Sequence, residues 1–203
     1  YDPYSSSKAC AELVTSAYRR SFLQSQGVGI SSARAGNVIG GGDWADDRLI
    51  PDILRSFEKN EPVAIRNIKA TRPWQHVLEP LSGYLILAQK LYDNREDYAE
   101  GWNFGPNERD VKSVDWILDK MISIWPNSSW RHDSGSHPYE AGLLKLDISK
   151  AKTKLGWNPV WELEYVLEKI VDWHKSWIDQ EDMQVVCLAE IKEYMKKMNN
   201  ENS

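Results

Sequence analysis

A tyrosine and a lysine at the start of the chain have the types and spacing that proton transfer needs. Tyr4 and Lys8 are four residues apart, so on a helix their side chains lie one turn apart on one face. A phenol has an ordinary pKa of about 10, and a nearby ammonium favours the phenolate. Such a pair can take or give a proton near neutral pH. The same spacing also occurs in plain surface contacts, so the rest of the chain must decide between these interpretations.

A predicted helix carries this pair, and a predicted strand comes next in the sequence. Residues 4–25 carry apolar side chains at steps of three and four, which predicts an amphipathic helix that begins after Asp2-Pro3 and ends near Gly27. Residues 28–35 predict a short buried strand. A helix, a glycine and a buried strand are typical of a layered α/β fold.

A glycine-rich stretch follows the predicted strand. Four glycines lie within residues 36–42, where the backbone approaches another group closely. Ligands of open α/β sheets bind beyond the carboxyl ends of strands, and Asn37 offers an amide N–H to a phosphate oxygen. The alternative is a connecting turn that binds nothing.

A basic and aromatic segment spans residues 69–77. Its Arg72 has the forked guanidinium that suits a phosphate, and the alternative is a surface ion pair. His76 is interpreted as a packed, hydrogen-bonded residue and not as an acid or base.

A loop over residues 132–140 is dense in hydrogen-bonding groups. His132, Asp133 and His137 fit no zinc spacing and have no cysteine nearby, so no metal site is predicted. A solvated loop or a ribose contact is the preferred interpretation. The remaining pattern predicts strands at 63–66, 101–105 and 128–130, and helices at 49–57, 79–92, 114–125 (with Ser113 as N-cap), 147–154, 163–179 and 183–198.

The composition restricts the classes of function. The net charge of -5 and the absence of a basic block argue against a nucleic-acid surface. Cys10 and Cys187 form no metal or disulfide pattern, which favours a reducing cytoplasm. No apolar run has the length of about 18 residues that a membrane span needs.

Five motifs in fixed order give the chain a resemblance to a known family. They resemble the extended short-chain dehydrogenase/reductases that act on nucleotide sugars, and most closely the branch of the CDP-glucose 4,6-dehydratases, over residues 1 to about 178. The motifs are Tyr4-x-x-x-Lys8, Arg34-Ala35-Gly36-Asn37-Val38-Ile39-Gly40-Gly41-Gly42-Asp43-Trp44, Asp47-Arg48-Leu49-Ile50-Pro51-Asp52, Thr71-Arg72-Pro73-Trp74-Gln75-His76-Val77 and Leu155-Gly156-Trp157-Asn158-Pro159.

The resemblance implies an α/β fold: the C-terminal part of a Rossmann-type domain joined to a smaller mixed α/β substrate domain. Residues 1–38 are expected to end the NAD-binding domain. Residues 39–178 mainly bind the nucleotide sugar, with the strand near 101–105 returning to the Rossmann sheet, and residues 179–203 form a helical tail. No glycine-rich dinucleotide turn, Ser/Thr or Asp-Glu pair precedes Tyr4. The chain is therefore expected to be the C-terminal portion of a longer enzyme and to be inactive by itself.

The same resemblance implies a chemistry. Tyr4 takes the proton of the sugar 4-OH while a hydride passes to NAD, and Lys8 assists the phenolate and holds the nicotinamide ribose. An upstream acidic pair then helps to expel the 6-OH as water, and the hydride returns to C6. The resemblance implies cofactor contacts by Tyr4, Lys8 and Arg34. It also implies substrate contacts by Asn37 and Arg72 at the diphosphate, Arg48 and Leu49 at the base, and His137 and Glu140 near the ribose.

The implied partner is CDP-glucose, with neither nucleic acid nor membrane, and the implied product serves deoxysugar and O-antigen biosynthesis in the cytoplasm. A homodimer or tetramer through the residue 4–25 helix is expected. Two alternatives remain open: a module that only binds a nucleotide-diphosphate sugar, and a fragment of a related NAD-dependent sugar epimerase or reductase.

Overall fold

The computed structural model describes residues 2–135 and 142–201, which fall into two compact units. The first unit comprises residues 1–35, 80–104 and 146–158, and the second comprises 36–79, 105–145 and 159–203. No helix in the described part of the chain is long and apolar enough to cross a membrane.

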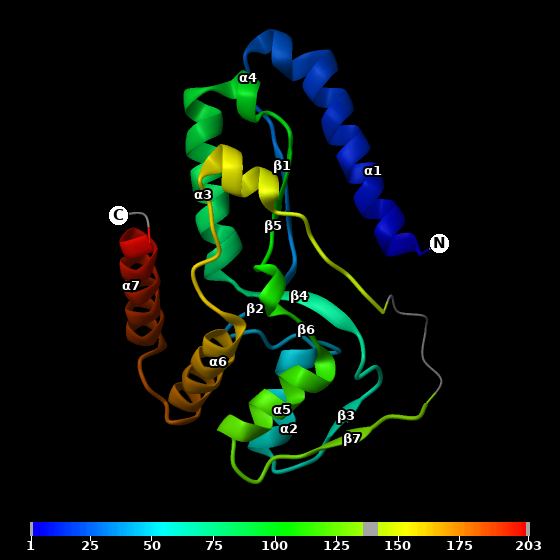
Figure 1. Ribbon diagram of the computed structural model, residues 1–203, viewed down its shortest axis with the longest axis vertical. Helices are drawn as coiled ribbons and strands as arrows, with labels where there is room; N and C mark the ends of the chain where they lie inside the picture. Colours follow the sequence, from blue (N-terminus) through cyan, green and yellow to red (C-terminus); the bar gives the residue numbers. More distant parts are fainter. Residues whose placement is uncertain (1, 136–141, 202–203) are drawn as a thin grey trace. The chain divides into compact units, whose positions relative to one another are not determined.

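The first unit packs helices beside a pair of parallel strands (Figure 1). Its elements are α1 (Pro3–Tyr18), β1 (Ser32–Ala35), most of α3 (Leu78–Asp93), α4 (Arg95–Tyr98), β5 (Gly101–Phe104) and a π-helical turn at Ala151–Leu155. Helical winding continues beyond α1 through a π turn at Arg19–Leu23 and a 3-10 turn at Gln24–Gln26. The helix predicted over 4–25 is thus confirmed.

Local sequence explains where this first helix begins and ends. The Asp2 carboxylate accepts a hydrogen bond from the Ser5 backbone N–H at 2.8 Å, and Pro3 occupies the first turn, where its missing N–H costs nothing. Gly27 ends the winding with a φ of 68°, a left-handed conformation that favours glycine.

The first strand is shorter and more open than the sequence predicted. β1 covers only Ser32–Ala35 of the predicted 28–35, and Ala33 and Arg34 are exposed. Among the described residues, β1 pairs only with β5, in parallel, with Ser32 opposite Gly101 and Ala35 opposite Phe104. The prediction of a buried strand was wrong because apolar character alone does not say how many neighbours cover a strand.

The second unit surrounds a short mixed sheet. In its order β2-β4-β6, β4 lies centrally, parallel to β2 and antiparallel to β6, while β3 and β7 form a separate parallel pair. The elements are β2 (Asn37–Ile39), α2 (Leu49–Glu58), β3 (Val63–Ile65), β4 (Thr71–His76), a 3-10 turn (Glu108–Asp110), β6 (Val111–Ser113), α5 (Val114–Ile124), β7 (Trp130–His132), α6 (Leu163–Ile178) and α7 (Met183–Glu201).

Strand β4 is one of the elements that the sequence analysis missed, together with β2, β6 and the short helix α4. Its residues 72–76 are all buried, although the stretch contains an arginine, a proline, a glutamine and a histidine. Proline is rare in central strands because it cannot donate to the ladder, and polar residues seldom fill a core. Tertiary context, not local propensity, makes this segment a strand.

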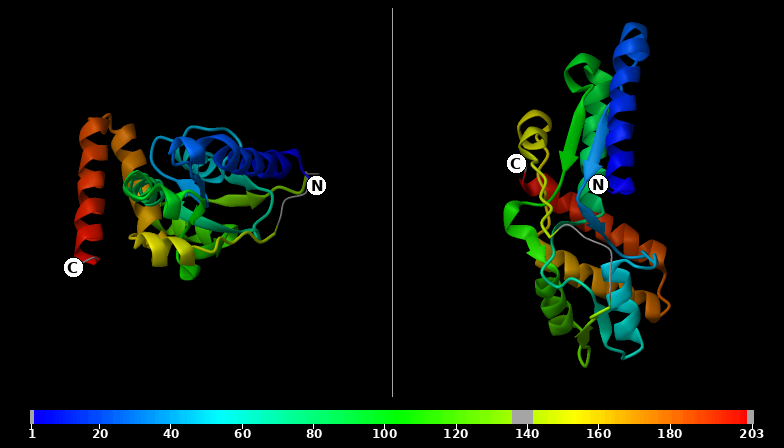
Figure 2. Two further views of the ribbon diagram at one scale, coloured as in Figure 1. Left: turned by 90° about the horizontal axis from the view of Figure 1, so that it is seen from above. Right: turned by 90° about the vertical axis from the view of Figure 1, so that its right-hand side faces the viewer.

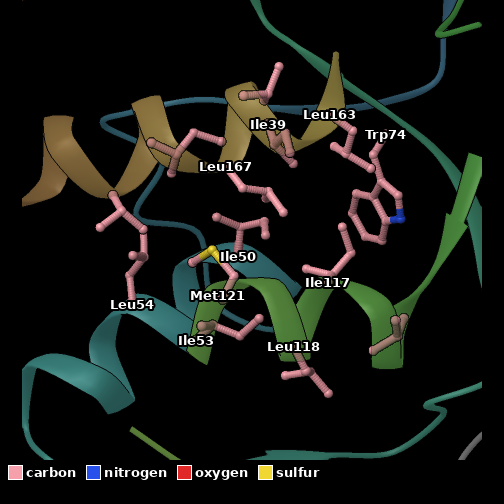
Figure 3. Packing of buried hydrophobic residues seen from close by; sticks show 14 of the residues in the cluster. Ile39, Ile50, Ile53, Leu54, Trp74, Ile117, Leu118, Met121, Leu163 and Leu167 are labelled. Atoms are coloured by element: carbon pink, nitrogen blue, oxygen red, sulfur yellow. The ribbon is translucent and has the colours of Figure 1, made fainter. Parts of the chain in front are cut away.

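Helices α2, α5 and α6 enclose the core of the second unit (Figure 3). On α6, Val166, Ile170 and Trp173 are buried, whereas Trp177 is 40% exposed and does not belong to the core. Ser113 precedes α5 as predicted, but its hydroxyl bonds to the Asp115 carboxylate and caps no backbone N–H. The residues labelled in Figure 3 are Ile39, Ile50, Ile53, Leu54, Trp74, Ile117, Leu118, Met121, Leu163 and Leu167.

A buried carboxylate fastens α7, which lies alongside α6 in Figures 1 and 2. The Glu79 carboxylate is 1% exposed and accepts hydrogen bonds from the backbone N–H groups of Val160 and Trp161, the latter at 2.8 Å. The Tyr194 hydroxyl of α7 donates a further bond to it at 2.8 Å. A buried carboxylate needs such donors, so the tail is a docked part of this unit.

We expect Tyr194→Phe to lower the free energy of unfolding by about 1–2 kcal/mol, because a buried charged acceptor loses one donor. Chemical denaturation measures this loss. Tyr165→Phe is the matched control, since that hydroxyl donates to Glu193 at an exposed position. Equal losses in the two variants would contradict the role assigned to Glu79.

Candidate functional site

The predicted catalytic pair lies on one face of α1. The Lys8 Nζ is 5.5 Å from the centroid of the Tyr4 ring, which confirms the one-turn spacing. Both side chains are exposed, Tyr4 at 71%. The ammonium lies over the electron-rich ring, at a distance where cations and aromatic faces attract each other.

A third residue at the same helical step attaches this face to the sheet. Glu12 follows Lys8 by four residues, and its carboxylate accepts hydrogen bonds from Arg34 Nε and from the Ser32 hydroxyl, both at 2.7 Å. The bond from Arg34 is the main cause that holds the pKa of Glu12 below its ordinary value. The face that carries Tyr4 and Lys8 is therefore the face that turns toward β1.

The direction of α1 places the pair at a defined end of the strand. The helix runs antiparallel to β1, which returns beside it in Figures 1 and 2. Eight residues of helix separate Tyr4 from Glu12, or about 12 Å at 1.5 Å per residue. Tyr4 thus lies toward the carboxyl end of β1, the end at which parallel sheets bind ligands.

Arg34, predicted to contact the cofactor, has three of its donors engaged within the protein. Besides the bond from its Nε, Nη2 donates to Glu12 at 3.2 Å and Nη1 donates to Asn103 Oδ1 at 2.7 Å. The visible role of this guanidinium is to join α1, β1 and β5. Its contact with a cofactor stays a prediction.

The predicted diphosphate residues lie together on the sheet of the second unit. Asn37 of β2 stands opposite Trp74 of β4, and Arg72 lies two residues before Trp74, so all three side chains are on the same face. Gly36 allows this approach, because a Cβ there would meet the Pro73 carbonyl oxygen at 2.4 Å. The residues predicted to hold one group are thereby brought together.

Arg72 is not the surface residue that the alternative interpretation required. It is only 8% exposed and stands directly opposite Lys112 of β6. Arg72 Nη1 donates a hydrogen bond to the Thr71 carbonyl at 3.0 Å, and the Lys112 Nζ lies 5.3 Å from the centroid of the Trp116 ring. Sequence reasoning missed Lys112, because nothing in its local sequence reveals that β6 pairs with β4.

The glycines that follow β2 have a structural partner. A Cβ on Gly41 would lie 2.2 Å from the Trp173 indole of α6, and one on Gly40 would lie 3.0 Å from Val77. The close backbone approach predicted for this loop is confirmed, and its partner among the described residues is a tryptophan. Arg48 and Leu49 lie where α2 begins, the former exposed and the latter partly buried.

His76 is packed, as predicted. It is 0% exposed, its Nδ1 accepts a hydrogen bond from the Leu78 N–H at 3.3 Å, and burial lowers its pKa to about 4. It is therefore neutral at pH 7. Within the described ranges, no group of three His, Cys, Asp or Glu side chains could hold a metal. His137 and Glu140 lie outside the described residues.

Comparison with known proteins shows extensive sequence similarity. The sequence model of the family GDP-mannose 4,6 dehydratase matches residues 1–170. A CDP-glucose 4,6-dehydratase of Salmonella typhimurium is 58% identical over 201 residues, which are 96% of this chain and 56% of that protein. The chain thus spans about half the length of the relatives it matches.

Solved structures share the fold at lower identity. A UDP-glucuronic acid 4-epimerase from Bacillus cereus, in complex with UDP-glucuronic acid and NAD, superposes with a TM-score of 0.73 at 23% identity, over 86% of this chain and 53% of that one. A dTDP-glucose 4,6-dehydratase from Bacillus anthracis, in complex with NAD, gives a TM-score of 0.70 at 21% identity, over 87% and 53%. These likenesses confirm the Rossmann-type α/β fold expected from the sequence. Together with the match over residues 1–170, they establish that the chain belongs to the GDP-mannose 4,6 dehydratase family.

Proposed function

We propose that this chain is part of a nucleotide-sugar 4,6-dehydratase that converts CDP-D-glucose to CDP-4-keto-6-deoxy-D-glucose. The observation that carries the proposal is the Tyr4–Lys8 face, turned toward β1 and placed near its carboxyl end, in a chain 58% identical to a CDP-glucose 4,6-dehydratase. The exposure of both side chains leaves them accessible to a substrate.

In this proposal Tyr4 is the acid and base at the sugar. Its phenolate oxygen removes the proton of the 4-hydroxyl, and the Lys8 ammonium on the same face stabilises the negative oxygen. NAD, when bound, would supply a hydride acceptor for C4 and the same hydride for C6, and would therefore be recycled within each turnover. The carboxyl end of a parallel strand beside an exposed face suits this cofactor.

The diphosphate of the substrate is assigned to the sheet of the second unit. Asn37 supplies amide donors, and the opposed Arg72 and Lys112 supply positive charge. A fixed guanidinium is suited to bidentate phosphate contacts, and its burial reduces the screening of its charge by solvent. Arg48 and Leu49 are assigned to the base, and His137 and Glu140 to the ribose.

Association between copies is assigned to residues 4–25. Leu13, Val14, Tyr18 and Phe22 are all more than half exposed, an unusual amount of apolar surface for one helix. A homodimer or tetramer would bury this surface. The two free cysteines fit a reducing cytoplasm, the compartment assigned to deoxysugar and O-antigen biosynthesis. A sugar 4-epimerase is the second candidate, because such an enzyme shares the fold. The 58% identity to a dehydratase favours the first.

The role of Tyr4 can be tested in a chimaera in which this chain replaces the matching segment of the Salmonella typhimurium relative. We expect Tyr4→Phe to lower kcat for CDP-glucose by about 10²–10⁴, the usual contribution of an acid–base group, and to leave substrate affinity within about twofold. The alkali absorbance of the 4-keto product measures turnover. Tyr92→Phe, at an 87% exposed position of α3 without a lysine four residues on, is the control and should retain activity. A Tyr4→Phe chimaera with full turnover would refute this assignment.

The role of Arg72 can be tested by binding to the chain itself. Arg72→Lys keeps the positive charge and removes the forked guanidinium group. Because one charge-assisted hydrogen bond is lost, we expect calorimetry to show that the affinity for CDP-glucose falls by about tenfold or more. Arg109→Lys is the control, because Arg109 is exposed and pairs with Glu162 at 2.8 Å. Similar affinities for the two variants would exclude Arg72 from the diphosphate site.

A further inference from the structure

We propose that Arg55 and Trp44 form a clamp that fixes the loop of residues 43–48 and so decides which nucleotide base the protein accepts. Both are positioning residues: they act through Arg48 and Leu49, which follow the loop. The inference rests on the proposed function, since it concerns the base contacts assigned there.

Arg55 holds the loop by its backbone. From the second turn of α2, its Nη1 donates to the Trp44 carbonyl at 3.0 Å and its Nη2 donates to the Ala45 carbonyl at 3.3 Å. The guanidinium is itself oriented by a bond to Asp52 and lies 3.4 Å from Asp46. The rigid guanidinium group thus contacts two backbone carbonyls and two carboxylates, and these contacts fix the path of the loop against α2.

Trp44 holds the loop by its side chain. Its ring centroid lies 4.5 Å from that of Trp177, 5.7 Å from that of His174 and 6.2 Å from that of Trp173, all on α6. Aromatic rings at these separations attract each other beyond the area they bury. The loop is therefore attached to two helices, to α2 through Arg55 and to α6 through Trp44.

The glycines on the amino-terminal side of the loop support the same attachment. Gly41 packs so closely on Trp173 that a Cβ would meet the indole at 2.2 Å. Asp43, which also precedes Trp44, accepts a hydrogen bond from the Ala45 N–H at 3.0 Å. On the other side of Trp44, Asp47 has a φ of 58° and lies 3.5 Å from Arg66. The segment is thus tightly turned at both ends.

The clamp matters for the base because it determines where Arg48 lies. Arg48 is the residue before α2, extended at φ -115° and ψ 133°, and among the described residues no side chain caps the helix at this position. Arg48 and Leu49 therefore take their positions from the loop. The diphosphate residues are on the separate strands β2, β4 and β6, so releasing the loop should change base selection and not phosphate binding.

The test compares Arg55→Ala and Trp44→Ala with Arg109→Ala, which removes an exposed arginine and its ion pair far along the sequence from the loop. Hydrogen exchange measures how often residues 43–49 open. Calorimetry measures the affinities for CDP, UDP and inorganic pyrophosphate. Trp44 is 44% exposed, so its truncation keeps the test available if Arg55→Ala does not fold.

We expect both clamp variants to speed exchange in residues 43–49 by about tenfold, the loss of one to two hydrogen bonds or a ring contact. The preference for CDP over UDP should fall by a similar factor, while pyrophosphate affinity and the Arg109→Ala variant stay within twofold of the parent. A merely structural role would not change the CDP/UDP ratio selectively.

Two results would overturn the inference with the proposed function intact: unchanged exchange in the loop, or faster exchange with the CDP/UDP ratio preserved. If the parent chain binds none of the three ligands, the proposed substrate site fails and base selection by the clamp fails with it. The exchange rates would still decide whether Arg55 and Trp44 hold the loop.

Discussion

A run of buried polar side chains is the constraint around which the second unit is arranged. Of the six buried polar or charged residues in the described part of the chain, four lie within residues 72–79. Polar groups in a core require partners, and each of these imposes one on its surroundings. Glu79, in the first turn of α3, requires the backbone of residues 160–161 and the hydroxyl of Tyr194, so the chain that follows α5 must return to the start of α3 and α7 must dock. The docked position of the 183–201 helix therefore depends on a carboxylate more than a hundred residues earlier in the chain.

A core that encloses charge is costly unless the charge has a use. Arg72 of β4 is 8% exposed and stands opposite the half-buried Lys112 of the neighbouring strand β6. Packing alone would favour an apolar residue at either position. Proteins depart from consistent local rules mainly where function requires it, and this departure lies on the same sheet face as Asn37. The diphosphate contact proposed for this face would be one such use for the buried Arg72 guanidinium.

Sequence reasoning succeeded where a local signal existed. The periodicity of residues 4–25, the Asp2-Pro3 start and the Gly27 stop were enough to place α1, and the spacing of Tyr4 and Lys8 was enough to place them on one face. It failed for β4 because a stretch that reads Arg-Pro-Trp-Gln-His has neither the alternation nor the composition of a strand, and its burial depends on β2 and β6. It predicted that the backbone of the glycine loop approaches another group closely, but it could not name that group. Trp173 lies 132 residues after Gly41, and nothing in the local sequence shows that the two pack together.

The residue that sequence reasoning could have found is Glu12. It continues the step of four from Tyr4 through Lys8, so three successive turns of one face carry the proposed acid–base group, the cation proposed to support it and the carboxylate that attaches the helix. Because Arg34 and Ser32 bond to Glu12 and not to the reactive pair, the helix is oriented while Tyr4 and Lys8 stay exposed. An ion pair this accessible contributes little to folding stability, since solvent screens it. Its value lies in orientation: the forked contact with Arg34, reinforced by Ser32, fixes the rotation of α1 about its own axis, and that rotation decides which way the phenol points.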